Sequence, residues 1–357
     1  MVDSEEVAGD VGGVDGEAET ARRRFLKQAG VGAAASGALW VAPQVLGSRH
    51  VAAAAATGSP PDPPDPTPSW VQLSPLPAPP ARASHAMARD GAGNVVLFGG
   101  MNGQDALGDT WVWDGSTWTE KKPDHSPPPR VYPRMARDPS GGVVLFGGAD
   151  NAGYPTDTWV WNGSDWSEKS PGSSPPPRRG HAMARYGPEV AGNVVLFGGE
   201  NYGPMGDTWV WDGSDWTQKN PAHSPSPRSF HAMARGPSDG VVLVGGSGHS
   251  DTWGWDGSDW TQKNPVVSPP PFPTMHVLAR DAVGNVVMLI GVPTQPVPPL
   301  GNTWLWDDST WTRQSTDPSP SSWPGRAQPA MARDALGKVV LFGGWAGGPW
   351  GDTWVWG

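Results

Sequence analysis

The chain has 357 residues and a net charge of −10, and it contains 49 Gly, 42 Pro and 22 Trp but no Cys. The absence of Cys excludes disulfides, thiolate metal sites and cysteine nucleophiles. The acidic balance argues against nucleic acid and anionic membranes as partners. The N-terminal segment does not cause this balance, because residues 57–357 alone carry 28 acidic and 20 basic side chains.

Residues 1–56 are predicted to be a segment that directs export. The arginine pair, Phe25, Leu26 and Lys27, followed by an apolar stretch over residues 29–46, resemble a twin-arginine export signal, although Ala21 replaces the usual Ser or Thr. The resemblance implies export of a folded protein across a bacterial inner membrane, to the periplasm, the cell wall or the medium. The alternative is a membrane anchor, for which this Ala- and Gly-rich stretch is only weakly apolar.

Residues 57–68 form a Pro-rich segment, which we interpret as a stiff linker. The remainder, residues 69–357, repeats one unit six times, and its "DTW" or "NTW" marker returns after 44 to 51 residues. The markers begin at Asp109, Asp157, Asp207, Asp251, Asn302 and Asp352.

Each unit contains four short runs with the composition of β-strands. In the first unit they cover residues 85–90, 95–100, 109–114 and 117–122. An Asp-Gly pair between the third and fourth runs favours a tight antiparallel turn. Each unit is therefore predicted to be a four-stranded antiparallel meander, and six meanders arranged radially can bury both of their faces as a β-propeller.

The repeats resemble the kelch family. The resemblance rests on a paired glycine after an apolar strand, as at Gly99 and Gly100, on the downstream Trp, and on "PR" before the first strand. It covers residues 69–357 and implies an all-β, six-bladed propeller. Blade five departs from the pattern, because Ile290 replaces the first glycine. The resemblance is specific for fold and weak for function, since propellers include binding modules and enzymes.

The sixth unit ends at Gly357, before its fourth strand. The segment "SWVQLSP" at the start of the repeats matches "DWTQKNP" of the fourth strands. We therefore predict that residues 70–73 supply the outer strand of the last blade and close the ring, which hides strand edges. The alternative is that Trp70 is a chance residue of the linker. The Trp residues repeated in every blade are predicted to be core.

Five arginines precede the first strands, and blade five has Pro273 there together with Asn302 in place of the marker Asp. Their joint loss indicates an ion pair within each blade, such as Arg130 with Asp157. The alternative is a ring of arginines that holds an anion at the channel mouth, as in some kelch propellers. The five arginines are Arg82, Arg130, Arg178, Arg228 and Arg326.

A histidine recurs at one position in four blades, as His85, His181, His231 and His276. We expect a hydrogen-bonding residue of the core or channel rather than a metal ligand, because radial symmetry holds the four imidazoles apart. A second arginine ends the "MAR" motif in all six blades, as Arg89, Arg137, Arg185, Arg235, Arg280 and Arg333.

Variable loops between the second and third strands share one end of the ring with the "PR" segments, and this end is the predicted binding face. Its large side chains that do not repeat suit a sugar or a peptide, or they only cap the blades. These side chains are Tyr154, Tyr202, His249, Trp345 and Trp350.

Enzyme signatures are sparse. Without Cys the copper–radical chemistry of some kelch proteins is excluded, and no zinc spacing, phosphate loop or nucleophile elbow occurs. We expect an exported, non-catalytic monomer without metal or cofactor, whose partner is a protein or a cell-surface glycan. The alternative is a glycan hydrolase or lyase with its site at the same mouth, for which Glu200 with Tyr202 offers a weak sialidase-like pair.

Overall fold

A computed structural model describes residues 68–188, 192–270, 276–290, 303–314 and 326–357. The chain divides into two compact units, residues 1–63 and 64–357, and every described residue belongs to the second. The predicted export segment and linker lie outside the described residues, apart from the end of the linker at Pro68. Among the described residues there is no helix that could span a membrane.

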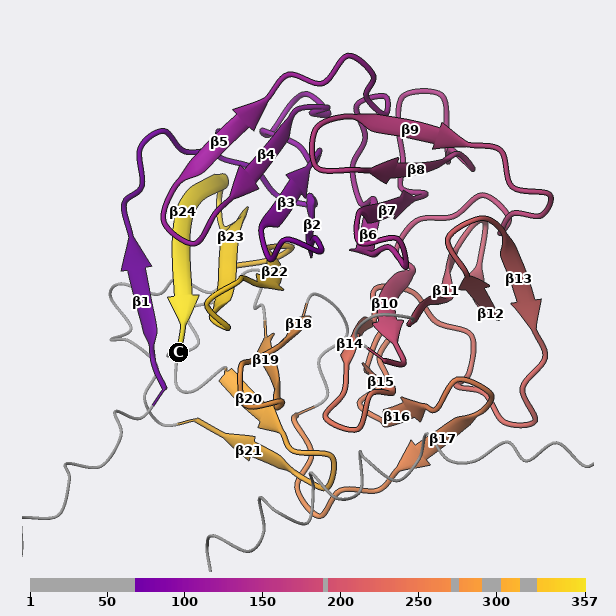
Figure 1. The fold of residues 1–357 in the computed structure, drawn as a ribbon. Helices are drawn as coiled ribbons and strands as arrows, with labels where there is room; N and C mark the ends of the chain where they lie inside the picture. Colours follow the sequence, from indigo (N-terminus) through magenta and orange to yellow (C-terminus); the bar gives the residue numbers. More distant parts are fainter. Residues whose placement is uncertain (1–67, 189–191, 271–275, 291–302, 315–325) are drawn as a thin grey trace, which may run out of the picture. The chain divides into compact units, whose positions relative to one another are not determined.

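The second unit is built from six four-stranded antiparallel sheets, which are the blades (Figure 1). The first strands of the blades are β2 (Ala86–Arg89), β6 (Arg134–Arg137), β10 (Ala182–Tyr186), β14 (Ala232–Arg235), β18 (His276–Arg280) and β22 (Ala330–Arg333). The second strands are β3 (Val95–Phe98), β7 (Val143–Phe146), β11 (Asn193–Glu200), β15 (Val241–Val244), β19 (Val286–Ile290) and β23 (Val339–Trp345). The third strands are β4 (Thr110–Trp113), β8 (Thr158–Trp161), β12 (Pro204–Trp211), β16 (Thr252–Trp255), β20 (Thr303–Trp306) and β24 (Pro349–Trp356). The outer strands are β5 (Trp118–Lys121), β9 (Trp166–Lys169), β13 (Trp216–Lys219), β17 (Trp260–Lys263), β21 (Trp311–Arg313) and β1 (Trp70–Leu73).

The first strands of neighbouring blades contact one another in a closed circle, from β2 through β6, β10, β14 and β18 to β22 and back to β2. In Figure 1 these strands surround the axis, and the outer strands lie at the rim. The predicted six-bladed propeller is therefore confirmed.

The ring closes in the sixth blade, where β1 pairs antiparallel with β24. Trp70 lies opposite Trp356 and Leu73 lies opposite Thr353. The Trp70 side chain is 4% exposed, and its ring centroid lies 5.6 Å from that of Trp356. The predicted closing strand is confirmed at the residues that the sequence indicated.

The hydrophobic core lies between adjacent blades. Between blades one and two, for example, Ala86, Ala88 and Phe98 meet Met135 and Trp161. Small residues on one face thus leave room for large residues on the next, as the alternation of side chains along a strand requires. The tryptophans that end the third strands and those that begin the outer strands are at most 4% exposed in every blade, which confirms that they are core. At the remaining repeated position Trp159 and Trp253 are half-buried.

A repeated hydrogen bond joins each outer strand to the preceding blade. The indole Nε1 of Trp166 in blade two donates to Thr110 Oγ1 in blade one at 2.9 Å. The equivalent bonds join Trp118 to Thr353, Trp216 to Thr158, Trp260 to Thr208, Trp311 to Thr252 and Trp70 to Thr303. The Thr of each "DTW" marker therefore fixes the next blade, and the circle includes the closing strand.

Candidate functional site

The arginines before the first strands form the predicted ion pair in the five blades that carry them. Arg130 Nη1 and Nη2 donate to the two carboxylate oxygens of Asp157, each at 2.6 Å. Its Nε donates to Pro128 O, and Trp159 Nε1 donates to the same carboxylate at 2.7 Å. Equivalent pairs join Arg82 to Asp109, Arg178 to Asp207, Arg228 to Asp251 and Arg326 to Asp352.

The electrostatics of this pair favour a structural role. Burial alone would raise the pKa of Asp157, but the hydrogen bonds and charge of Arg130, with Trp159, hold it below its ordinary value. The Arg130 side chain is 0% exposed. Because its donors already meet acceptors inside the blade, little is left for a ligand, and ligand binding by this arginine set stays a prediction.

The arginines of the "MAR" motif connect neighbouring blades at the other end of the first strands. Arg185 Nη1 donates to Asp138 O of blade two at 3.1 Å, and Arg235 Nη2 donates to Gly187 O of blade three at 3.0 Å. Arg333 likewise donates to Asp281 O of blade five. This set therefore ties the turns of adjacent blades together.

The repeated histidines insert between blades. His276 Nε2 donates to Val244 O of blade four at 2.7 Å, as expected for a hydrogen-bonding core residue. The rings of His85, His181 and His231 lie edge-on to a Phe of the preceding blade, with centroids 5.5 to 5.8 Å apart. Burial is the main cause that lowers the pKa of all four, so they are neutral at pH 7. No cluster of three His, Asp or Glu that could hold a metal occurs among the described residues.

The five predicted loop residues lie on four blades, because Trp345 and Trp350 both belong to blade six. The Arg179 guanidinium lies over the Tyr154 ring at 5.5 Å, and the Arg326 guanidinium lies over the Trp350 ring at 5.3 Å. Trp345 ends β23, and His249 lies within 3.3 Å of Ser226 Oγ. The Tyr154 contact joins blades two and three, the other contacts lie within one blade, and ligand binding by these loop residues stays a prediction.

The structure also shows where Glu200 and Tyr202, the weak sialidase-like pair, lie. Glu200 pairs with Arg179 at 3.0 Å and accepts a hydrogen bond from Ser229 Oγ at 2.9 Å. Tyr202 is fully exposed. Both carboxylate oxygens of Glu200 therefore have partners within the protein, and the hydrolase reading gains no support from this geometry.

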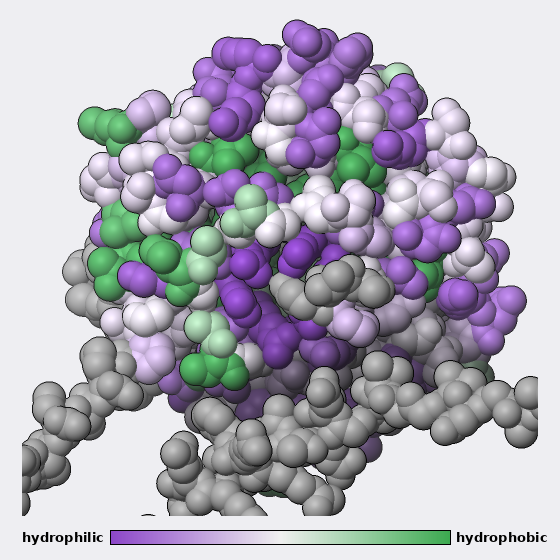
Figure 2. Space-filling view, viewed as in Figure 1, coloured by the Kyte–Doolittle hydropathy of each residue, from purple (hydrophilic) through white to green (hydrophobic). Residues whose placement is uncertain are grey.

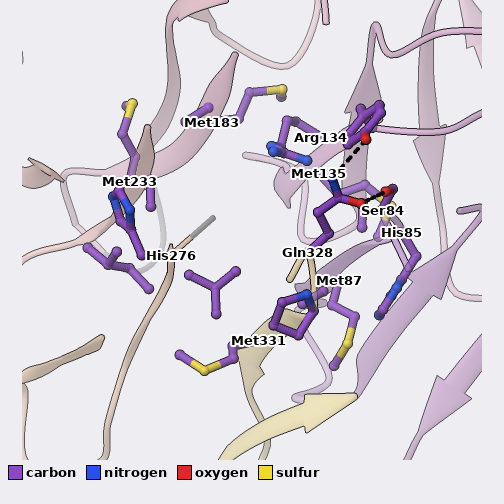
Figure 3. Close-up of a pocket in the computed structure, with 18 of the residues that line it drawn as sticks. Ser84, His85, Met87, Arg134, Met135, Met183, Met233, His276, Gln328 and Met331 are labelled. Carbon is purple, nitrogen blue, oxygen red and sulfur yellow. Dashed lines mark hydrogen bonds between the residues drawn. The ribbon is translucent and has the colours of Figure 1, made fainter. Parts of the chain in front are cut away.

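A cavity of about 140 Å³ occupies the axis, at the end where the first strands begin. It is lined by Ser84, Tyr132, Phe230 and Gln328, which precede the first strands, and by side chains of the first strands. Figure 3 shows some of these residues around the cavity. None of the ten predicted ligand-binding residues is among its lining residues. Figure 2 shows hydrophilic side chains gathered at a recessed centre of one face of the ring.

One backbone position recurs at the mouth of this cavity, directly before the His or Pro that precedes or begins the first strand. Its residue has a positive φ in five blades, between 55° and 65°. Gly180 suits this left-handed conformation, but Ser84, Tyr132, Phe230 and Gln328 adopt it at a cost. A conformation that favours glycine thus carries four different side chains, which we call the mouth residues.

The mouth residues contact one another across the axis. Gln328 Nε2 donates to Tyr132 Oη at 2.8 Å, and Ser84 Oγ donates to Gln328 Oε1 at 2.6 Å (Figure 3). The rings of Tyr132 and Phe230 meet edge-on at 5.7 Å. A side chain at Gly180 would lie 3.2 Å from the Phe230 ring, so the glycine makes room for it. Blades one, two, four and six therefore build one polar and aromatic mouth.

Arg134 is a further lining residue that the sequence reasoning missed. Its Nε donates to His181 O at 2.9 Å and its Nη1 donates to Pro133 O at 3.1 Å. Burial lowers its pKa to about 10, so the guanidinium remains charged at neutral pH. The signal was present in the repeats, because an alignment on "MAR" places Ala86, Ala182, Ala232, Val277 and Ala330 at this position.

Comparisons with known proteins agree with this fold. The family model described as the KLHDC2/KLHL20/DRC7 Kelch-repeats domain matches residues 67–246. A solved structure titled "Structure of YjhT" is similar with a TM-score of 0.57 and 16% identity, over 78% of this chain and 96% of that chain. That similarity shows the fold alone, and no curated protein matches. With half of its length matched by the family model, the chain belongs to the kelch-repeat proteins of the KLHDC2/KLHL20/DRC7 Kelch-repeats domain family.

Proposed function

We propose that this protein is an exported, non-catalytic binding module whose ligand, a glycan or a protein segment, enters the mouth of the central channel. The kelch propeller is a generic binding scaffold, and its channel mouth is the place where all blades converge. The proposed site consists of the mouth residues, which line the central cavity, and not of the ten residues predicted from the sequence. Export is supported by the resemblance of residues 21–27 to a twin-arginine signal.

The observation that carries the proposal is the set of four mouth residues on a left-handed backbone. A position under structural selection alone favours Gly, as in Gly180. Here Tyr132 and Phe230 present aromatic rings, and Gln328 presents an amide, at a recessed site to which blades two, four and six contribute them. Aromatic rings combined with a few convergent polar groups are typical of sites that bind sugar rings or peptide side chains.

The proposal is tested by screening the purified full-length chain on a glycan array and a peptide array, with product analysis of every hit. We expect Tyr132→Ala and Phe230→Gly to weaken binding of a hit at least tenfold, and Tyr202→Ala, a fully exposed loop residue, to leave it unchanged. Melting temperatures of the variants control for folding. Binding that Tyr202→Ala abolishes and the mouth variants preserve would place the site on the loops instead. Turnover that Glu200→Gln abolishes would favour the enzyme.

Export is tested separately by cell fractionation of the full chain and of a variant in which Arg22 and Arg23 are both replaced by Lys. We expect the variant to remain in the cytoplasm, because the arginine pair is the recognised feature of this signal. Equal export of both chains would overturn the localisation.

A further inference from the structure

The interface between blades four and five differs from the other five interfaces at one position of the third strand. Each of the other blades carries an aliphatic side chain there, and that side chain packs against the next blade. These residues are Val112, Val160, Val210, Leu305 and Val355. Blade four has Gly254 instead, so its interface with blade five lacks the side chain that fills the other interfaces.

A cavity of about 230 Å³, which we call the blade-four cavity, lies at this place. Val242, Gly254 and Thr261 line it and lie side by side on the face of blade four that meets blade five. The turn over residues 236–240 also lines it, and because β14 begins at the mouth and ends at this turn, the cavity lies at the opposite end of the ring. It shares no lining residue with the channel cavity.

A second departure from the repeat lines the same cavity. Between the third and outer strands, blades one to four carry a glycine with a left-handed backbone, and blade five carries Asp308 there. The glycines are Gly115, Gly163, Gly213 and Gly257. Asp308 keeps the left-handed conformation, with a φ of 83°, which a residue other than glycine adopts at a cost. Ser238 Oγ of blade four donates to Asp308 Oδ2 at 2.7 Å, so two breaks of the repeat meet in one cavity.

Lys263 supplies a positive charge to the blade-four cavity. Its side chain lies over Gly254, because a Cβ atom at residue 254 would be 2.8 Å from Lys263 Cε and 3.6 Å from its Nζ. Among the described residues no carboxylate forms an ion pair with this ammonium group. Lys219 holds the equivalent position in blade three, but there Val210 fills the interface. The absence of a side chain at Gly254 therefore gives Lys263 a place from which it can donate to a ligand.

The charges that line the cavity favour a ligand with an ammonium group. Asp239 forms ion pairs with the "MAR" arginines of blades four and five, at 2.6 and 3.6 Å, so its charge is balanced within the protein. Asp256 and Asp308 remain, and Lys263 is the one positively charged side chain of the described lining. Two carboxylates with one ammonium group leave a net negative charge, which attracts a cationic group and repels an anion.

The size and the remaining lining limit the ligand further. A cavity of about 150 Å³ holds a molecule of the size of benzene, so the larger blade-four cavity accepts a molecule of the size of a hexose. Val241 and Val242 provide apolar surface for a carbon frame. The hydroxyl groups of Ser238 and Thr261, together with the ammonium group of Lys263, can donate to oxygen atoms of a ligand.

We propose that the blade-four cavity binds a small primary amine that also carries hydroxyl or carboxylate oxygens. This site is separate from the mouth residues and does not depend on the function proposed for them. Two sources can supply such an amine, an amino sugar and an amino acid, and the experiment distinguishes them.

Calorimetry on the full-length chain measures dissociation constants for two matched pairs of probes. D-Glucosamine is compared with D-glucose, and L-valine is compared with isovalerate, which lacks the amine. We expect the amine of at least one pair to bind tenfold or more tightly than its partner, and a pair that shows this preference identifies a source. Equal binding within both pairs, or no amine that binds more tightly than about 1 mM, would overturn the proposal.

Two variants restore what the other blades carry, Gly254→Val and Asp308→Gly. Each should weaken amine binding at least tenfold, because the first fills the cavity and the second removes a carboxylate. Neither should lower the melting temperature, because a valine displaces only the flexible end of Lys263 and a glycine suits the left-handed backbone at residue 308. Amine binding that both variants retain, or a clear decrease in melting temperature in both, would overturn the proposal.

Lys263→Met and Lys219→Met form a matched pair of variants, since the two lysines hold the same position in neighbouring blades. Lys263→Met should weaken amine binding, and Lys219→Met should leave it unchanged. Equal effects of the two would overturn the proposal. Loss of amine binding in Tyr132→Ala but not in Lys263→Met would place the amine at the mouth, which overturns this inference and supports the proposed function.

Discussion

Replacing Asp157 with Asn removes the counter-ion of Arg130 while changing almost no volume. The Arg130 side chain is 0% exposed and Asp157 is 17% exposed, so the guanidinium has no route to solvent after the substitution. Removing one partner of a buried ion pair costs about 3–5 kcal/mol, because the remaining charge stays desolvated. For a unit of this size that corresponds to a decrease in melting temperature of about 6–10 °C.

A double-mutant cycle separates the energy of the ion pair from the contributions of the two individual side chains. Arg130→Met is expected to cost about 2–3 kcal/mol, because Pro128 O and Gly147 O lose their donor while Asp157 keeps the bond from Trp159. The double variant should cost about as much as Arg130→Met alone, so the coupling energy should equal the cost of Asp157→Asn, about 3–5 kcal/mol. The free energies of unfolding are measured by urea titration.

The control is the exposed pair of Glu120 on β5 and Lys122 directly after it, whose side chains are 36% and 78% exposed. Glu120→Gln should change the free energy of unfolding by less than about 0.5 kcal/mol, because solvent screens the pair. Strictly additive effects of Arg130→Met and Asp157→Asn would refute the ion pair as a stabilising unit, whatever the distances show.

Two further predictions concern the ring and its histidines. Trp70→Ala should lower the free energy of unfolding by about 3–5 kcal/mol, because it removes a buried ring and the bond to Thr303, and an unchanged urea midpoint would contradict the closing role of β1. The buried histidines have pKa values below the ordinary 6.5, so the unfolded chain binds more protons than the folded protein. Their contribution to the stability of the fold is therefore present above pH 6.5 and is lost as the pH falls below it. Each pH unit below 6.5 should cost up to about 1.4 kcal/mol per histidine. Melting curves from pH 7.5 to 5.5 measure this loss, and replacing His231 with Gln should reduce its slope.

The fold was predictable because the sequence repeats one unit six times, and the six copies can be compared with one another. A single "DTWVWD" is an ambiguous strand, but its six copies at nearly constant spacing indicate blades, and the missing copy after Trp356 indicates where the ring closes. The joint loss of Arg and Asp in blade five pointed to the ion pair for the same reason. That blade's own residues, Pro273 and Asn302, lie outside the described residues.

The site was less predictable, because repetition reports what the blades share and a site depends on where they differ. Large side chains in variable loops were conspicuous, yet Trp350 stacks on Arg326 within its own blade. Ser84 and Gln328 are ordinary residues in sequence, and only their positive φ and mutual contact across 244 positions show that they form one mouth. Contacts between residues so distant in the chain follow from ring closure and not from any local pattern.

Closure by β1 also determines how misassembled copies of this protein can associate. The strand that completes the sixth blade is the earliest part of the propeller to be synthesised, and its partner β24 is the last. A copy whose β1 is detached presents β24 as an open edge, with a row of backbone donors and acceptors that no neighbouring strand pairs. The best-matched strand to fill that edge is β1 of another copy, so the seam of the ring is the natural point for domain-swapped oligomers to begin.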